Sequence, residues 1–365
     1  MEESIHESRI IQYNMDDLAK MDLLHTSNRD DIVIYNANRI IYLLPILMPM
    51  KKFLLRLMLF VVVAYLLATI MDIITSRGLQ CVPKNHLETL NTIMHDTLNN
   101  DILILGNSRG ACAYNPLYLD SVLCCNSRNI SVSGQTYIIS DLRYRIYRRN
   151  NPAPKLLILN IDHIELGSGT LGFERYQYFP YIHDTLVQEI LDLHYFTWMD
   201  KYIPMWRYRG NYKYVGLGVL DYFGIYHIDA TQHKGWTKNI GTFNGTNMRH
   251  LLLTGGEIKC SIYDSTLIAF EKLMQHAELD GTNAVMVYSP VYYVAQENMS
   301  KNFDTIMSTY RGLSQKYNVP ILDYRSLPMN YDSTFFIDAT HLNYIGAREF
   351  SIQLAHDIDS IGFLK

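Results

Sequence analysis

Cysteine and charge are both scarce in this chain of 365 residues, and their scarcity excludes several classes of protein. The five cysteines show no CxxC or metal-type spacing, so neither a zinc site nor a redox pair is predicted, and their odd number argues against a complete disulfide framework. Charged residues make up 19% of the chain and the net charge is −4. Without a basic stripe interleaved with aromatic residues, binding to nucleic acid is not predicted either.

One long apolar run stands out from this ordinary composition. From Leu57 the sequence reads LMLFVVVAYLLATIM, close to the ~17–20 residues that a membrane-spanning helix needs. Because Lys51, Lys52 and Arg56 precede the run, the positive-inside rule places the N-terminus in the cytoplasm and the rest of the chain outside. No small-x-small cleavage site comes after it, which favours an uncleaved signal-anchor at residues 50–76 over a removed signal peptide. The sequence thus predicts a single-pass protein of the cytoplasmic membrane with an extracytoplasmic domain.

Residues 1–49 have more than one interpretation. Met50-Lys51-Lys52 directly before the apolar core resembles the natural start of a signal sequence. The preceding stretch is then either a cytoplasmic tail or an upstream extension from a misassigned start codon. Alternatively, residues 39–45 are a real structured element. N-terminal sequencing of the native protein distinguishes these interpretations.

From about Pro83 onward the pattern alternates between helix and strand. Short apolar runs predict five strands, at residues 101–105, 129–132, 155–161, 284–288 and 319–322. Continuous apolar strands separated by helices are typical of a parallel sheet that is covered on both faces. The predicted fold is therefore α/β, a three-layer α/β/α domain over residues 83–365 with a mostly parallel five-stranded sheet of flavodoxin-like type.

Residues 166–254 break this alternation. The segment is dense in aromatic residues, too long for a simple connection and too apolar to be disordered, so we interpret it as an inserted cap. Most of its aromatic side chains are expected to form the core of the cap. Alternatively, some of them form a stacking floor for sugar rings, and the candidates for substrate binding are Trp198, Trp206, Tyr208 and Trp236.

Two short segments far apart in the chain carry the residues for acyl chemistry. Ser108 follows the first predicted strand within GNSRG, and Asp338 and His341 share the loop DATH near the C-terminus. A serine hydroxyl is a poor nucleophile until an adjacent base takes its proton, and that base needs an orienting group. The two segments contain all three groups. Alternatively, Ser108 only caps the next helix and His341 is an ordinary histidine at a helix start.

This arrangement resembles the SGNH (GDSL-like) hydrolase superfamily, in which the nucleophile follows the first strand and a DxxH loop precedes the last helix. The GNSR first block resembles membrane-anchored branches that are linked to acylation of envelope polysaccharides or wall polymers. The resemblance covers about residues 100–165 and 255–360. It implies that Ser108 is the nucleophile, His341 the base and Asp338 its orienting carboxylate.

The resemblance also implies an oxyanion hole, formed by the backbone N–H groups of Ser108 and Gly134 and by an asparagine after the third strand. Here the chain departs from the family pattern GxND, because it reads LNID at residues 159–162. Register favours Asp162 for this position, whereas chemistry favours Asn160, since a carboxylate repels an oxyanion and an amide N–H stabilises it. No metal or organic cofactor is implied.

The implied function is that of a serine esterase or O-acyltransferase acting on an acyl ester, expected to be acetyl, of a cell-envelope glycan or polymer. The alternative is a non-catalytic scaffold of an envelope assembly that retains the fold. Two further features have structural interpretations. Arg109 either pairs with a nearby carboxylate or contacts substrate, and DATQH at residues 229–233 imitates the DATH loop with one extra residue, for which a structural role is favoured. The sequence leaves open hydrolase versus transferase, and the oligomeric state.

Reporter fusions test the predicted orientation. A reporter enzyme that is active only outside the cytoplasm should be active when fused after Gly78 and inactive when fused before Lys51, because the apolar run carries the residues after it across the membrane. The measurement is reporter activity divided by the amount of fusion protein. Activity of the fusion before Lys51, or inactivity of the fusion after Gly78, would refute a single inward-to-outward anchor.

Overall fold

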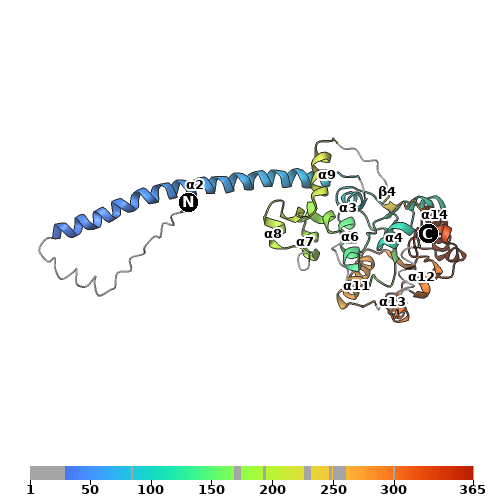
Figure 1. Cartoon of the computed structure of the whole chain (residues 1–365). Coiled ribbons are helices and arrows are strands. Elements are labelled where there is room, and N and C mark those ends of the chain that lie inside the picture. Colours follow the sequence, from blue (N-terminus) through green and yellow to red (C-terminus); the bar gives the residue numbers. More distant parts are fainter. Residues whose placement is uncertain are drawn as a thin grey trace, which may run out of the picture. The chain divides into compact units, whose positions relative to one another are not determined.

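The chain divides into two units, residues 1–67 and 68–365. The computed structural model describes residues 29–83, 85–167, 174–191, 195–225, 232–245, 249, 260–298 and 301–364 (Figure 1). The five cysteines are free thiols.

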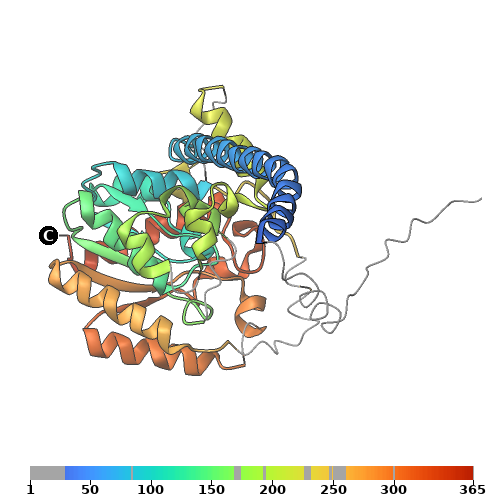
Figure 2. The same cartoon turned by 90° about the vertical axis from the view of Figure 1, so that its left-hand side faces the viewer.

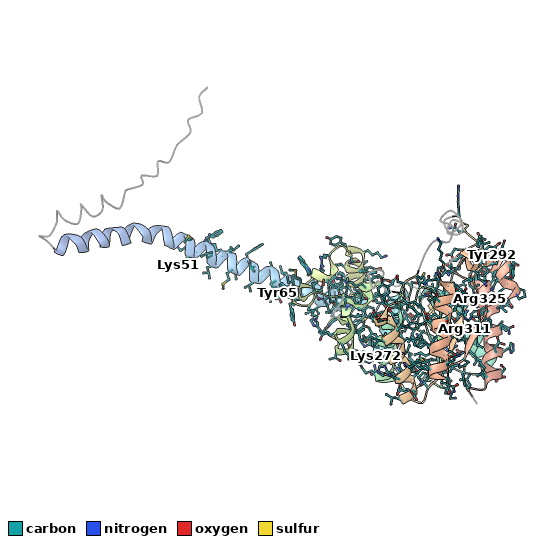
Figure 3. The ribbon with its side chains drawn as sticks, turned by 90° about the horizontal axis from the view of Figure 1, so that it is seen from below. Lys51, Tyr65, Lys272, Tyr292, Arg311 and Arg325 are labelled. Atoms are coloured by element: carbon teal, nitrogen blue, oxygen red, sulfur yellow. The ribbon has the colours of Figure 1, made fainter. Side chains whose placement is uncertain are left out.

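A single helix, α2 (Arg29–Leu79), makes up the described part of the first unit and continues into the second. Its residues from Met50 onward form a stretch long and apolar enough to cross a membrane, and residues 50–67 are all exposed. Figure 3 shows their side chains projecting from the helix between Lys51 and Tyr65. The helix contains the predicted segment 50–76, and it starts earlier and ends later than that segment. Membrane insertion, and a translation start at Met50, stay predictions.

A five-stranded parallel sheet forms the centre of the second unit (Figure 2). Its strands are β1 (Ile102–Leu105), β2 (Ser127–Asn129), β3 (Leu156–Asn160), β6 (Asn283–Tyr288) and β7 (Ile321–Asp323), in the order β2-β1-β3-β6-β7. All neighbours pair in parallel, for example Ile104 opposite Ile158. From β1 the chain continues to β2 on one side and then to β3, β6 and β7 on the other side, so the switch point lies between β1 and β3. In sheets of this kind, ligand sites lie beyond the carboxyl ends of the strands at the switch point. The prediction of five strands in a mostly parallel sheet is confirmed, but β2 lies at residues 127–129 and shares only Asn129 with the predicted strand at 129–132.

Helices cover both faces of this sheet because successive strand side chains point to opposite faces, and in β1 and most of β3 and β6 the side chains on both faces are apolar. Leu103 and Leu157 belong to one core, whereas Ile104 and Ile158 belong to the other. The first core is closed by α3 (Asn85–His95), α6 (Tyr137–Asn150), α11 (Asp264–Leu279) and α13 (Phe303–Tyr317). The second core is closed by α4 (Ser108–Ala113), α5 (Pro116–Leu123) and α14 (Tyr344–Ile361). The predicted three-layer α/β/α fold is confirmed.

The aromatic-rich segment consists of short elements and, in its described parts, adds no strand to the main sheet. These elements are η1 (Arg175–Tyr181), α7 (Thr185–Leu191), α8 (Trp198–Tyr202), η2 (Trp206–Tyr208), α9 (Tyr212–Tyr222), β4 (Gln232–His233) and β5 (Trp236–Thr237). Tyr178, Phe179 and Phe196 join the same core as α3 and α6, so this segment shares the core of the domain. The predicted bounds at 166 and 254 stay a prediction, and residue 254 lies outside the described residues. The remaining elements, α12 (Tyr293–Asn298), η3 (Pro328–Tyr331) and η4 (Ser333–Phe335), come after β6 and β7.

Candidate active site

Ser108 is the first residue of α4 and comes three residues after the last residue of β1, Leu105. Asn107 caps this helix, since its side-chain oxygen accepts the backbone N–H of Arg109 at 2.9 Å. Gly106 makes the tight turn before it, because a Cβ at that position would lie 2.6 Å from the Cβ of Asn160 at the end of β3. The strand-to-helix turn thus presents the Ser108 hydroxyl at the carboxyl edge of the sheet.

The DATH loop is held in a narrow hairpin that leads into α14. Phe336 and Leu342 form an isolated antiparallel bridge, and the backbone N–H of Ile337 donates to the carbonyl of His341 at 3.0 Å. Asn343 then caps α14, and its side-chain oxygen accepts the backbone N–H groups of the second and third helical residues at 2.9 and 3.0 Å. The loop is therefore fixed at both ends before any substrate binds.

The structure brings Ser108, His341 and Asp338 together across 233 residues of sequence. The Nε2 atom of His341 lies 2.9 Å from the Ser108 hydroxyl, and its Nδ1 atom lies 2.9 and 3.0 Å from the two Asp338 carboxylate oxygens. Burial would raise the pKa of Asp338, but hydrogen bonds from His341 and from the backbone of Thr340 more than offset it, and the pKa is lowered. Since an ionised carboxylate only accepts hydrogen bonds, Nδ1 carries the imidazole proton and Nε2 is free to accept the serine proton.

A fully buried carboxylate, Asp162, lies beneath the turn that carries Ser108. It accepts the side-chain amide of Asn107 at 2.9 Å and the backbone N–H of Ile164 at 2.6 Å, and it lies 3.5 Å from the Arg109 guanidinium. Burial would raise the pKa of Asp162, but His163, Arg109 and Asn107 together lower it. Asp162 is thus engaged as an acceptor that holds the GNSR turn in place.

Arg109 pairs with protein groups, which is one of the two alternatives considered for it. Its guanidinium donates to the backbone carbonyl of Ser289 at 2.5 Å and to the Ser289 hydroxyl at 3.0 Å, and it lies 4.5 Å above the centre of the Tyr288 ring. Both residues lie at the carboxyl end of β6. Arg109 is buried and so ties β1, β3 and β6 together beneath the nucleophile.

Glu165 is a second buried carboxyl group beneath the same turn, and sequence reasoning missed it. It accepts the backbone N–H of Asn107 at 2.6 Å. Burial, together with repulsion from the Asp162 carboxylate, raises the pKa of Glu165 well above its ordinary value. Its position three residues after Asp162, beyond the end of β3, was the available sequence signal.

The two remaining oxyanion candidates lie on either side of the nucleophile turn. Asn160 is fully buried, and its side-chain oxygen accepts the hydroxyls of Tyr114 and Ser289, each at 2.9 Å. Its Nδ2 has no hydrogen-bond partner among the described residues. Gly134 is exposed at a turn with φ of +69°, in a loop joined to β1 by the bond from the backbone N–H of Val132 to the carbonyl of Gly106.

The four aromatic candidates for substrate binding lie in two kinds of place. Tyr208 and Trp236 are 1% and 3% exposed, and the Trp236 indole N–H donates to the carbonyl of Cys112 at 2.7 Å. The structure therefore gives sugar stacking no support at these two positions. Trp198 and Trp206 are exposed, but α8 and η2 lie with the end of α2, well away from α4 in Figure 1. The side chain of His233, in the DATQH motif, lies outside the described residues, as do residues 229–231.

A different aromatic group adjoins the catalytic loop. The backbone N–H of Tyr292 donates to the carbonyl of Ala339, inside the DATH loop, at 3.1 Å. The Tyr292 ring contacts Tyr293 at 4.9 Å between centroids, and Tyr293 stacks on Tyr331 at 5.4 Å. Tyr331 is 65% exposed. We name Tyr292, Tyr293 and Tyr331 the loop tyrosines; the first two come after the end of β6, which was the signal that sequence reasoning overlooked.

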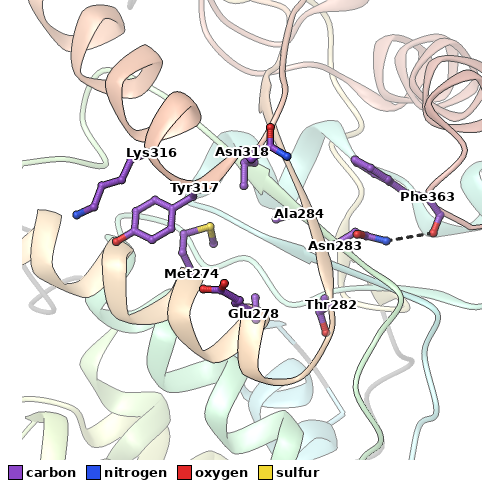
Figure 4. A pocket seen from close by; sticks show the side chains of 11 residues that line it. Met274, Glu278, Thr282, Asn283, Ala284, Lys316, Tyr317, Asn318 and Phe363 are labelled. Atoms are coloured by element: carbon purple, nitrogen blue, oxygen red, sulfur yellow. Dashed lines mark hydrogen bonds between the residues drawn. The ribbon is translucent and has the colours of Figure 1, made fainter.

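Hollows in the surface lie on both edges of the sheet. One of about 720 Å³ adjoins the start of α14 and is lined by residues such as Phe243, Thr334 and Tyr344. Another, of about 530 Å³, lies at the amino ends of β6 and β7, the edge opposite the triad, and is lined by Asn283 and Tyr317 among others (Figure 4). Among the described residues, no group of three His, Cys, Asp or Glu side chains is placed to hold a metal ion.

Comparisons with known proteins add few findings. No family model matches the sequence, and no curated protein matches it. Among solved structures, the chain is similar to a candidate acylhydrolase from Bacteroides fragilis, with 12% identity, a TM-score of 0.35, and coverage of 72% of this chain and 88% of that one. It is also similar to a family two carbohydrate esterase from Clostridium thermocellum solved with cellohexaose, with 10% identity, a TM-score of 0.36, and coverage of 74% of this chain and 66% of that one. Likeness this low carries no argument about activity.

Replacement of Glu165 should change how stability depends on pH. Because burial raises its pKa in the folded state, Glu165 contributes stability that is complete below its unfolded pKa of about 4.3 and is lost as pH rises toward the folded pKa. Glu165→Gln keeps an oxygen to accept the Asn107 N–H and does not titrate. The free energy of unfolding of the wild type minus that of the variant should therefore fall between pH 4 and pH 8, by at most about 1.4 kcal/mol per pH unit. Urea titrations measure it, and a constant or rising difference would contradict the raised pKa.

Proposed function

We propose that this protein is a serine esterase or O-acyltransferase that acts on an acyl ester of a cell-envelope glycan or polymer. The observation that carries the proposal is the hydrogen-bonded series from Ser108 through His341 to Asp338, at 2.9 Å for each link. A serine, a histidine and a carboxylate in this order and at these distances are what nucleophilic acyl transfer requires. Their location at the carboxyl edge of the parallel sheet supports the same conclusion.

In the first half of the reaction, the Ser108 oxygen attacks the ester carbonyl carbon while Nε2 of His341 takes its proton. Asp338 holds the imidazole and stabilises the positive charge that develops on it. The tetrahedral intermediate then collapses, the alcohol leaves with the proton from His341, and the acyl group remains on Ser108.

In the second half, an acceptor hydroxyl attacks the acyl-enzyme and His341 takes its proton. Water as acceptor gives a hydrolase, and a sugar hydroxyl gives a transferase. When this second intermediate collapses, His341 returns the proton to Ser108 and the triad is regenerated. The same residues therefore serve either reaction.

The developing oxyanion needs donors on the side of Ser108 facing the turn. The backbone N–H of Ser108 lies in the first turn of α4, where N–H groups have no intrahelical acceptor. Gly134 supplies a second backbone donor in the proposal, and the unpartnered Nδ2 of Asn160 supplies the third. We favour Asn160 over Asp162 for this role, because the oxygens of Asp162 accept from Asn107 and Ile164.

The loop tyrosines favour a sugar-containing substrate. Tyrosine presents a flat ring with a polar tip, which suits stacking on sugar rings, and the exposed Tyr331 leads by way of Tyr293 and Tyr292 to the catalytic loop. Together with the apolar helix that precedes the domain, this supports a polymer at the cell surface as the substrate and an extracytoplasmic active site.

Loss of the Ser108 hydroxyl should abolish the activity. Ser108→Ala should lower the hydrolysis of a small activated acetyl ester by at least ~10³-fold, because the members of a triad act as a unit. A fluorophosphonate probe should label the wild type at Ser108 and leave the variant unlabelled. Ser121→Ala, at an exposed serine of α5, is the matched control and should keep full activity and labelling. An unlabelled wild type, or undiminished turnover in Ser108→Ala, would favour the non-catalytic scaffold.

The loop tyrosines should matter for large substrates only. Tyr331→Ala should lower the rate on an acetylated polysaccharide relative to the small ester by roughly twofold to tenfold, the equivalent of about 0.5–1.5 kcal/mol of lost stacking. Binding energy from remote parts of a substrate is expressed at the reacting centre, so the small ester should be unaffected. Tyr317→Ala, in the cavity on the opposite edge of the sheet, is the aromatic control. An unchanged ratio in Tyr331→Ala, measured at an unchanged melting temperature, would contradict a role in glycan binding.

A further inference from the structure

The last turns of α2 are built into the domain that contains the triad. Asp72, Thr75, Ser76 and Leu79 are buried, although they belong to the helix whose preceding residues are exposed and apolar. Within the second unit, residues 68–79 pack against η2 and α9. The end of the apolar helix is thus part of the folded domain.

A buried polar cluster fastens this helix end. The Arg207 guanidinium pairs with the Asp72 carboxylate and donates to the Ser76 hydroxyl at 2.9 Å. The backbone N–H of Met205 donates to the same carboxylate at 2.7 Å, and the Tyr208 hydroxyl lies 2.8 Å from that of Ser76. Met205, Arg207 and Tyr208 all bond to Asp72 or Ser76, so η2 is held in one position on α2.

A glycine contact fastens α9 in the same way. A Cβ on Gly78 would lie 1.7 Å from the carbonyl oxygen of Gly218, and a Cβ on Gly218 would lie 2.4 Å from the carbonyl oxygen of Thr75. Only glycine at both positions lets the two helix backbones approach this closely. α8 and α9 both contact η2, so all three elements are held around the end of α2.

These three elements carry a set of large aromatic side chains that face solvent. We name this set the α8–α9 surface: Trp198, Tyr202, Trp206, Tyr212, Tyr222 and Phe223. Trp198 is 62% exposed and Tyr212 is 77% exposed. Trp206 and Tyr212 line one groove of about 340 Å³ with Met205 and Val215. In Figure 1, α8 and α9 lie at the same end of the second unit as the last turns of α2.

We propose that the α8–α9 surface rests in the interface of the lipid bilayer that α2 spans. Tryptophan and tyrosine are the residues that concentrate at the level of the lipid headgroups, since one end of each ring system is apolar and the other is polar. The apolar helix α2 continues without a break to the residues that are packed in the domain. Ile70, Met71 and Ile73 are still exposed on α2, next to the buried Asp72. A span of about 20 residues that starts near Lys52 ends at this point.

The chemistry of the surface favours lipid over a second copy of the chain or another protein as its occupant. The exposed rings lie on α8, η2 and α9, the elements that are held around the last turns of the apolar helix. The Arg209 guanidinium lies 4.9 Å above the centre of the Trp206 ring and pairs with the Asp200 carboxylate at 2.7 Å. The proposal depends on the membrane helix and is independent of the proposed enzyme activity.

The three tryptophans of the chain provide a test with an internal control. Trp198 and Trp206 lie on the α8–α9 surface, whereas Trp236 is buried in the domain core. The full chain is reconstituted into phosphatidylcholine vesicles whose acyl chains are brominated, and its tryptophan emission is compared with that in unbrominated vesicles. The wild type is compared with Trp198→Phe/Trp206→Phe, which retains only Trp236 and changes no buried residue.

We expect brominated lipid to quench the wild type at least about twofold more than the double variant, because rings at the interface lie ~5–10 Å into the headgroup and acyl boundary. Iodide in the water should quench the wild type in vesicles no more than it quenches the double variant. Equal quenching of both proteins by brominated lipid would overturn the proposal. If, in that case, iodide also failed to quench the wild type, the rings would be covered by protein. If iodide quenched the wild type strongly, the rings would face water. A chain that fails to float with the vesicles would overturn it as well.

Discussion

The buried carboxylate of Asp162 is the group on which the position of Ser108 depends. It lies at the end of β3 and holds two residues of the turn after β1, Asn107 through its amide and Arg109 through its guanidinium. Arg109 in turn reaches Ser289 at the end of β6. Removal of one partner from such a buried pair costs roughly 3–5 kcal/mol, because the other charge stays buried without compensation. Three neighbouring strand ends are thereby joined beneath one hydroxyl.

The other half of the site is held by different means. Asp338 and His341 lie in a hairpin that leads into α14, which begins at the cap that Asn343 provides and packs on α5 and α4 over the second core. The triad therefore joins two rigid parts, one set by the sheet and one by a helix of the second core. Groups supported in this way keep their distances without help from a substrate, which is the condition for electrostatic and general-base catalysis to be efficient.

The contact between Asp72 and Arg207 changes how the apolar helix should be regarded. The last turns of α2 share their hydrogen bonds with η2 and are therefore part of the folded domain, not a tether outside it. Cleavage within residues 72–79 would also remove part of the domain core.

The sequence alone determined the layers of the fold and singled out Ser108, Asp338 and His341, which the structure joins by hydrogen bonds. Short apolar strands between helices have only one way to bury both faces, and a serine after the first strand with a DxxH loop before the last helix is a pattern of local spacing. Tertiary structure decided the rest. Burial separated Tyr208 and Trp236 from the exposed Trp198, although all three are aromatic residues of one segment. The engagement of Asp162 by Asn107, and the burial that raises the pKa of Glu165, depend on neighbours distant in sequence. No residue's own identity or spacing carries that information, because burial and partners exist only once the chain has folded.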